Sequence, residues 1–195
     1  VGVATSNTSF FSVYPFTTGT GFGTRYANPA TLPAGGGNGI AFTATAVAVA
    51  QTTSPFVSVY PFNTVSGIGT RYANPSPVLP GASVHVDFSP AGDAIALTSA
   101  TTPYVTAYAW TAGSGFGTKY SNPTTLLLTG AFSVRFTAYT LTVSSSSGGP
   151  NVLVYPWSSV SGFGTPPSSA TASNFGTGGT INDAVLATGY YYMPA

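Results

Sequence analysis

The only histidine of the chain, His85, stands two residues before Asp87. Residues at i and i+2 lie on the same face of a strand, so these two side chains form a conceivable acid–base pair. A serine hydrolase would also need a nucleophile that the rest of the site holds in place, and no repeat feature marks one serine among the many. We therefore interpret the two residues as a hydrogen-bonding or solvent-facing pair on a strand.

Residue counts argue against other catalytic and metal-binding sites. One histidine and no cysteine leave neither a two-histidine site nor a thiolate site for a metal ion. A glycosidase needs two positioned carboxylates, and the chain has three acids, of which Asp93 lies in a predicted turn and is expected to bond nearby backbone. We predict that the protein is not an enzyme and that it uses no cofactor and no metal.

Three of the four basic residues share one position in a repeat, and each precedes a tyrosine. The resulting candidates for surface recognition are Arg25, Tyr26, Arg71, Tyr72, Lys119 and Tyr120. A cation beside an aromatic side chain, repeated around a fold, is one way to make equivalent contacts with a glycan or a protein. In the competing interpretation, the alkyl stem covers an edge strand and the charge guards this edge against aggregation.

The repeat itself extends far beyond these pairs. The sequence Val-Tyr-Pro-Phe, followed by Gly-Phe-Gly-Thr-Arg-Tyr-Ala-Asn-Pro, spans residues 13–29 and returns at 59–75, at 107–123 and, in decayed form, at 154–167. Its first tyrosines lie 46, 48 and 47 residues apart, at Tyr14, Tyr60, Tyr108 and Tyr155. Pairs of glycines follow at the same intervals. Two markers that keep one period predict a repeat array.

Each period contains four short segments typical of β-strands, separated by Gly, Pro and Asn turn signals. The first round predicts strands at residues 10–16, 21–26, 40–42 and 46–50, and no segment has the apolar spacing of a helix. Four strands in 40–50 residues match one blade of a β-propeller. We predict an all-β fold, a β-propeller of four-stranded blades of about 47 residues, with four blades visible. The alternative is that these blades are part of a larger propeller.

We expect residues 1–195 to form a single β-propeller domain, with repeat units of about 1–39, 40–83, 84–131 and 132–179 and a C-terminal closing segment 180–195. Val1 aligns with Val47, so the chain is expected to enter at the second strand of its first blade. Residues 180–185 resemble an inner strand that would close a four-bladed ring. Residues 189–192 would then compete with residues 1–5 for one strand position, which keeps the larger ring open as an alternative.

Composition limits the classes of partner. Only 4% of the residues are charged, 43% are hydrophobic, and the net charge is +1. Four scattered cations make no basic patch, which argues against nucleic acid as a partner. No apolar run approaches the roughly 18 residues of a membrane-spanning helix, so we expect no membrane insertion.

Residues 86–97, Val-Asp-Phe-Ser-Pro-Ala-Gly-Asp-Ala-Ile-Ala-Leu, resemble the two inner strands of a WD40-type blade, with the Ser-Pro-x-Gly turn between them. Residues 104–110 are similar to the third strand, although the Trp-Asp ending and the opening Gly-His of the family are missing. The nearly uncharged Gly-Phe-Gly-Thr repeats resemble propeller repeats of bacteriophage virion proteins. The resemblance implies a divergent WD40-like propeller.

This resemblance and the lack of a charged site predict a structural or assembly protein. We expect a virion surface component, such as a decoration, tail or fibre protein, that acts through protein–protein contacts on a virion or in another extracellular setting. Its expected partners are other copies of itself or other virion or filament subunits. The alternative function is adhesion, as a carbohydrate-binding or lectin-like propeller that binds a cell-surface glycan.

Overall fold

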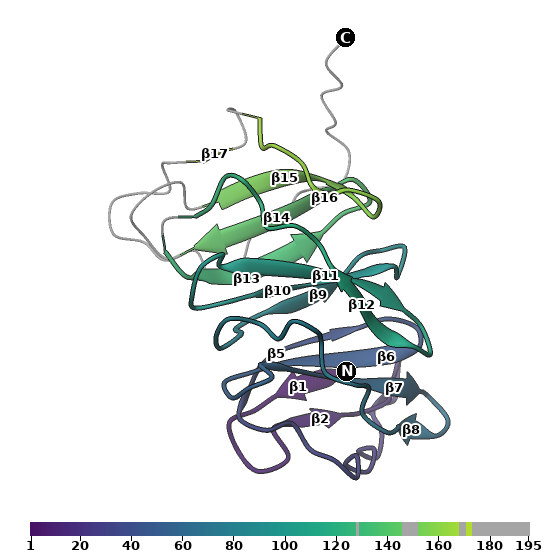
Figure 1. The fold of residues 1–195 in the computed structure, drawn as a ribbon. Coiled ribbons are helices and arrows are strands. Elements are labelled where there is room, and N and C mark those ends of the chain that lie inside the picture. Colours follow the sequence, from purple (N-terminus) through teal and green to yellow (C-terminus); the bar gives the residue numbers. More distant parts are fainter. Residues whose placement is uncertain (128, 146–151, 168–170, 173–195) are drawn as a thin grey trace.

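The computed structural model describes residues 1–127, 129–145, 152–167 and 171–172, and its regular elements are all β-strands. The strands form successive antiparallel sheets, the blades, which are stacked in chain order (Figure 1). Within the described ranges there is no helix, and so none long and apolar enough to cross a membrane. The prediction of an all-β fold built from four-stranded blades is confirmed.

Blades 2, 3 and 4 each hold four strands that pair in chain order. Blade 2 contains β5 (Gly37–Phe42), β6 (Ala46–Gln51), β7 (Val57–Asn63) and β8 (Gly67–Ile68). Blade 3 contains β9 (Val86–Phe88), β10 (Ala94–Thr98), β11 (Val105–Thr111) and β12 (Gly115–Lys119). Blade 4 contains β13 (Ala131–Phe136), β14 (Thr140–Ser145), β15 (Val152–Ser158) and β16 (Gly162–Phe163), and β17 (Thr171–Ala172) pairs with β15.

Blade 1 lacks an inner strand among the described residues. It contains β1 (Gly2–Ala4), β2 (Phe11–Val13), β3 (Phe16–Thr17) and β4 (Gly21–Phe22). β1 pairs with β2, β3 pairs with β4, and no described strand pairs with the other edge of β1. Because β3 continues β2 beyond Pro15, the four pieces correspond to the second, third and fourth strands of a blade. β1 therefore has the position of a second strand, as the alignment of Val1 with Val47 predicts.

The outer strands are shorter than expected, and proline explains the difference. The sequence predicts one strand over residues 21–26, but β4, β8 and β16 cover only two residues each. Each pairs with the two residues that follow a proline and ends where the partner strand reaches Pro15, Pro61 or Pro156. Proline has no N–H to donate to the next strand. In blade 3 the equivalent residue is Ala109, and there β12 extends over five residues.

The hydrophobic core lies between the blades rather than within them. Three clusters of buried residues fill the spaces between blades 1 and 2, 2 and 3, and 3 and 4. Blade 1 and blade 4 lie at opposite ends of the stack (Figure 1), so the described blades do not close into a ring. The closing segment 180–195, with the predicted strands at 180–185 and 189–192, lies outside the described residues.

Candidate functional site

The tyrosines predicted to recognise a partner lie between blades. Each follows an outer strand, and its ring lies over a glycine of the next blade: Tyr26, Tyr72 and Tyr120 contact Gly67, Gly115 and Gly162. A Cβ at these glycines would come within 3.0 to 3.1 Å of the ring. All three glycines have φ between +80° and +92°, a backbone conformation that glycine adopts without a steric penalty. Glycine therefore satisfies both the turn and the close approach of the ring.

The tyrosine hydroxyls also bond to the next blade, at the turn between its third and fourth strands. Tyr26 Oη donates to the carbonyl of Thr64 at 2.7 Å, and Tyr120 Oη donates to that of Ser159 at 2.6 Å. Tyr72 Oη instead accepts from the backbone N–H of Gly113 at 3.3 Å. Each tyrosine thus acts as a bridge between two blades.

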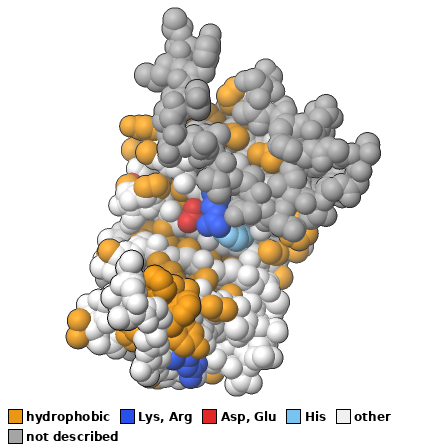
Figure 2. Space-filling model, turned by 180° about the vertical axis from the view of Figure 1, so that it is seen from behind, with side chains coloured by type: hydrophobic (Ala, Val, Ile, Leu, Met, Phe, Trp, Pro, Cys, Tyr) orange, Lys and Arg blue, Asp and Glu red, His pale blue; other side chains and the backbone are white. Residues whose placement is uncertain are grey.

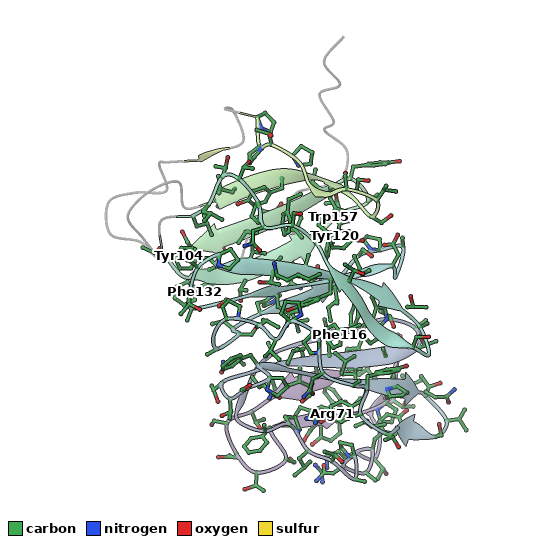
Figure 3. The ribbon with its side chains drawn as sticks, viewed as in Figure 1. Arg71, Tyr104, Phe116, Tyr120, Phe132 and Trp157 are labelled. Atoms are coloured by element: carbon green, nitrogen blue, oxygen red, sulfur yellow. The ribbon has the colours of Figure 1, made fainter. Side chains whose placement is uncertain are left out.

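Edge-to-face aromatic contacts complete each bridge. Tyr26, Tyr72 and Tyr120 contact Phe62, Trp110 and Trp157, with ring centroids 5.4, 5.1 and 5.0 Å apart. Figure 3 shows Tyr120 and Trp157 side by side. Such pairs contribute about 0.5–1.5 kcal/mol beyond the area that they bury.

A second series of tyrosines bonds in the opposite direction, from the third strand back to the preceding blade. Tyr60, Tyr108 and Tyr155 donate to the carbonyls of Thr31, Pro77 and Thr125 at 2.9, 2.8 and 2.7 Å. Burial raises the pKa of Tyr60 and of Tyr108 to about 12, and it also raises the pKa of Tyr155. For Tyr60, the bond with Ser58 and the charge of Arg71 oppose this rise in pKa.

The predicted cations bond within their own blades. Arg25 Nη1 donates to Ser12 Oγ at 3.3 Å and to Asn28 Oδ1 at 3.0 Å. Arg71 makes the equivalent bond to Ser58 Oγ at 3.4 Å.

Lys119 donates to the side-chain oxygen of Asn122 and, at 3.3 Å, to the carbonyl of Tyr120. Burial lowers the pKa of Lys119. Packing and hydrogen bonding therefore account for the repetition of all three cation–tyrosine pairs, and a recognition role for Arg25, Tyr26, Arg71, Tyr72, Lys119 and Tyr120 stays a prediction.

The carboxylate of Asp87 joins two blades. Its Oδ2 accepts from the backbone N–H of Phe136 on β13 at 2.8 Å, and its Oδ1 accepts from the N–H of Phe88 at 3.0 Å. The backbone N–H of His85 donates to Thr98 Oγ1 at 2.8 Å. Figure 2 shows the histidine beside a basic group, which in turn lies beside an acidic group. These bonds give Asp87 a structural role at the inner strands.

Asp93 lies in the turn where the sequence placed it. Its Oδ1 accepts from Ser89 Oγ at 2.7 Å, and its own N–H donates to that hydroxyl at 3.1 Å, so a side chain rather than backbone is the carboxylate's partner. Across the described part of the chain, no cluster of three or more His, Cys, Asp or Glu residues has the geometry to hold a metal ion.

One feature that the sequence did not reveal is an apolar face of blade 1 whose side chains are exposed. We call it the leading face of blade 1, because it corresponds to the side that blades 2, 3 and 4 turn toward the blade before them. Its residues are Val1, Val3, Tyr14, Phe16 and Phe22. Beside it, a groove of about 590 Å³ lies between blades 1 and 2, lined in part by Ile40, Phe42 and Phe62.

The leading face is more exposed than its equivalents in later blades. Val3 is 47% exposed, whereas Val49, one repeat later, is 0% exposed. Phe16 is 56% exposed, whereas the equivalent Trp110 is 3% exposed. The alignment of Val1 with Val47 was the available sequence signal. The alignment alone does not show how exposed the first blade is.

No family model and no curated protein matches the chain. Among solved structures it is similar to the Dos1 propeller, with 11% identity and a TM-score of 0.51 over 88% of this chain and 41% of that one. A complex of KlAtg21 with the coiled-coil of AgAtg16 matches at 9% identity and a TM-score of 0.43, over 64% of this chain and 40% of that one. The chain spans about two fifths of the length of either structure. Together with the stacked blades, the first likeness shows the fold, which is that of a β-propeller.

Proposed function

We propose that this protein is a structural or assembly protein that acts through protein–protein contacts. In its most specific form, the proposal is a virion surface component such as a decoration, tail or fibre protein, without catalytic activity. The observation that carries the proposal is that the aromatic residues fall into two groups. Those between blades hold the propeller together, whereas Phe16 and Phe22 on the leading face of blade 1 are more than half exposed.

Two physical arguments support contact with protein. Large exposed apolar patches on otherwise polar proteins mark interaction sites, and Phe16, Phe22, Val1 and Val3 are all exposed at one end of the stack. A chain with only 4% charged residues also has little charge to protect a free monomer against association. Both properties suit a subunit that is packed beside other subunits.

The carbohydrate-binding alternative receives less support. It needs tyrosines that present a ring face to a sugar, and the repeated candidates Tyr72 and Tyr120 pack that ring against Trp110 and Trp157 of the next blade. Their hydroxyls are also engaged with the next blade. We therefore propose assembly alone.

The test is the location of the protein in the system that encodes it. Particles are purified on a density gradient, and quantitative mass spectrometry measures the ratio of this chain to the capsid and tail subunits. We expect the chain to co-purify at a fixed ratio through repeated gradients. Recovery only in the free-protein fractions would contradict the virion role.

A further inference from the structure

We infer that two equivalent grooves at successive blade interfaces bind an extended, proline-rich segment of a partner protein. The inference rests on the proposed assembly function and names the surface and the chemistry of the partner. The grooves lie between blades 2 and 3 and between blades 3 and 4, so each has a described blade on both sides. The leading face of blade 1 contributes to neither groove.

The two grooves are built alike, one repeat apart. The larger groove, of about 380 Å³, is lined by residues 42–45 of blade 2, residues 88–92 of blade 3 and Trp110. The smaller groove, of about 180 Å³, is lined by residues 89–91 of blade 3, by the equivalent turn of blade 4 and by Trp157. The turn that follows β9 is therefore a wall of both grooves.

The tryptophans that line the grooves are not required by the packing of their repeat position. They are the only two of the chain, and the same position holds Phe16 in blade 1 and Phe62 in blade 2. Phe62 makes edge-to-face contacts with centroids 5.4 and 5.5 Å apart. Trp110 makes similar contacts at 5.1 and 5.4 Å. A phenyl ring thus serves this position in the core, and the indole adds something else.

What an indole adds is an N–H donor. Trp110 is 3% exposed and Trp157 is 8% exposed. Among the described residues, neither indole N–H has a hydrogen-bond acceptor, and neither nitrogen is fully enclosed. Each N–H therefore opens on the groove that its ring lines. Since a buried tryptophan N–H usually has a partner, we expect the acceptor to come from a bound molecule.

The hydroxyls in the grooves are already used as acceptors. Ser89 Oγ accepts two backbone N–H groups, at 3.1 and 3.0 Å. Thr43 Oγ1 and Thr137 Oγ1 accept backbone N–H groups of their own turns at 3.1 and 3.0 Å. Among the described residues that line the grooves, the only charged one is Asp93, and its Oδ1 accepts from Ser89 Oγ at 2.7 Å. A ligand that fits has acceptors, few donors and no negative charge.

A proline-rich segment has this chemistry. Each proline offers a carbonyl acceptor and has no N–H that would need an acceptor in the groove. The polyproline II conformation of such a segment is formed before binding, and aromatic-lined grooves recognise it. Phe42, which is 38% exposed, and Pro90 give the larger groove an apolar lining for a proline ring. A glycan fits less well, because its hydroxyls are donors as well as acceptors.

The first experiment uses the two tryptophans as reporters, because each groove holds one and the chain has no other. The two indole N–H signals of the full chain are followed by ¹⁵N–¹H NMR and assigned with Trp110→Phe and Trp157→Phe. The ligand is a proline peptide of about ten residues, which spans about 31 Å in the polyproline II conformation. We expect both indole protons to move downfield with this peptide and neither to move with a Gly/Ser peptide of the same length.

The second experiment measures the affinity of a labelled proline peptide by fluorescence anisotropy. The variant with both Trp110→Phe and Trp157→Phe loses both donors and should bind roughly tenfold more weakly. Ala91→Asp puts a charge on the exposed turn that both grooves share, and it should weaken binding at least roughly tenfold. Val65→Asp is the matched control, because Val65 is 92% exposed and lines neither groove. Near-ultraviolet circular dichroism confirms that each variant is folded.

Each failure has its own meaning. Indole signals that do not respond to the proline peptide would overturn the inference and leave the assembly function standing. An equal response to the Gly/Ser peptide would overturn the preference for proline, and a response only to neutral oligosaccharides, titrated in parallel, would overturn the protein partner. Binding that survives both the double tryptophan variant and Ala91→Asp would overturn the grooves as its site. Absence from purified particles would overturn the virion role alone.

Discussion

Blade 1 and blade 3 carry the same repeat but differ in what lies in front of them. In blade 3, Trp110 contacts Tyr72 of the preceding blade at 5.1 Å, and Tyr108 donates a hydrogen bond back to that blade. In blade 1, the equivalent Phe16 and Tyr14 face no described blade, and Phe16 is exposed. One motif thus supplies core in one place and surface in another.

The difference shows where the stability of this fold resides. Each described blade interface repeats the same tyrosine bridges, so the stack resembles a linear array in which stability is a sum of neighbour terms. A substitution on the leading face of blade 3 removes contacts with blade 2 and so lowers the free energy of unfolding. The matching substitution in blade 1 removes no contact with a preceding described blade. Paired substitutions at equivalent positions therefore test the comparison directly.

The largest contrast is expected for the aromatic residue at the end of the third strand. Trp110→Ala opens a cavity between blades 2 and 3 and should lower the free energy of unfolding by about 3–5 kcal/mol. Phe16→Ala removes a side chain that is more than half exposed and should cost less than about 1 kcal/mol. Urea denaturation measures the free energy of unfolding of both variants. Equal losses would contradict the difference between blade 1 and blade 3.

The bridging glycines should give the next largest contrast. Gly115→Ala and Gly21→Ala both place a Cβ at positive φ, which costs roughly 1–2 kcal/mol. Only at Gly115 does the Cβ meet a ring, that of Tyr72 at 3.1 Å, which should add about 1–3 kcal/mol of overpacking. Thermal unfolding should therefore show a larger loss for Gly115→Ala, and the opposite order would contradict the packing described for Tyr72.

A smaller contrast is expected for the hydroxyl of the third-strand tyrosine. Tyr108→Phe leaves the carbonyl of Pro77 without this donor and should cost about 1–2 kcal/mol. Tyr14→Phe should change the free energy of unfolding by less than about 0.5 kcal/mol, as is usual for a surface substitution. Chemical denaturation at neutral pH compares the two, and a loss of similar size at Tyr14 would count against an open leading face.

Alkaline pH should lower the free energy of unfolding through the buried tyrosines of the third strands. Because burial raises the pKa of Tyr60 and Tyr108 from 10.0 to about 12, the unfolded chain loses their protons first as the pH rises. The stabilisation from the protonated hydroxyls is complete below pH 10 and is lost between about pH 10 and 12. Denaturation at stepped pH should show this fall, with a shallower slope for Tyr60→Phe. An unchanged slope would contradict the burial of this hydroxyl.

The blades were predictable because two independent sequence markers keep one period. Strand positions such as 94–98 follow from local alternation and turn signals, and the structure confirms β10 at these residues. The outer strands were predicted too long, because the effect of Pro15 and Pro61 falls on the neighbouring strand rather than on their own. Local patterns describe a residue's own strand better than they describe its partner's.

The contacts between blades could not be predicted from the sequence. Tyr26 and Gly67 lie 41 residues apart, and only the fold shows that the ring fills the space above the glycine. The bond from Phe136 to Asp87 spans 49 residues. The repetition of tyrosine and glycine at a shared period was a visible signal, and it is also the pattern that made these tyrosines candidates for recognition.

The most direct test of this account compares the accessibility of one repeat position in two blades. Val3→Cys and Val49→Cys are treated with a thiol reagent under native conditions in dilute solution. We expect the thiol at position 49, where valine is 0% exposed, to be protected and the thiol at position 3, where valine is 47% exposed, to react rapidly. Equal protection of the two thiols in dilute solution would contradict the account.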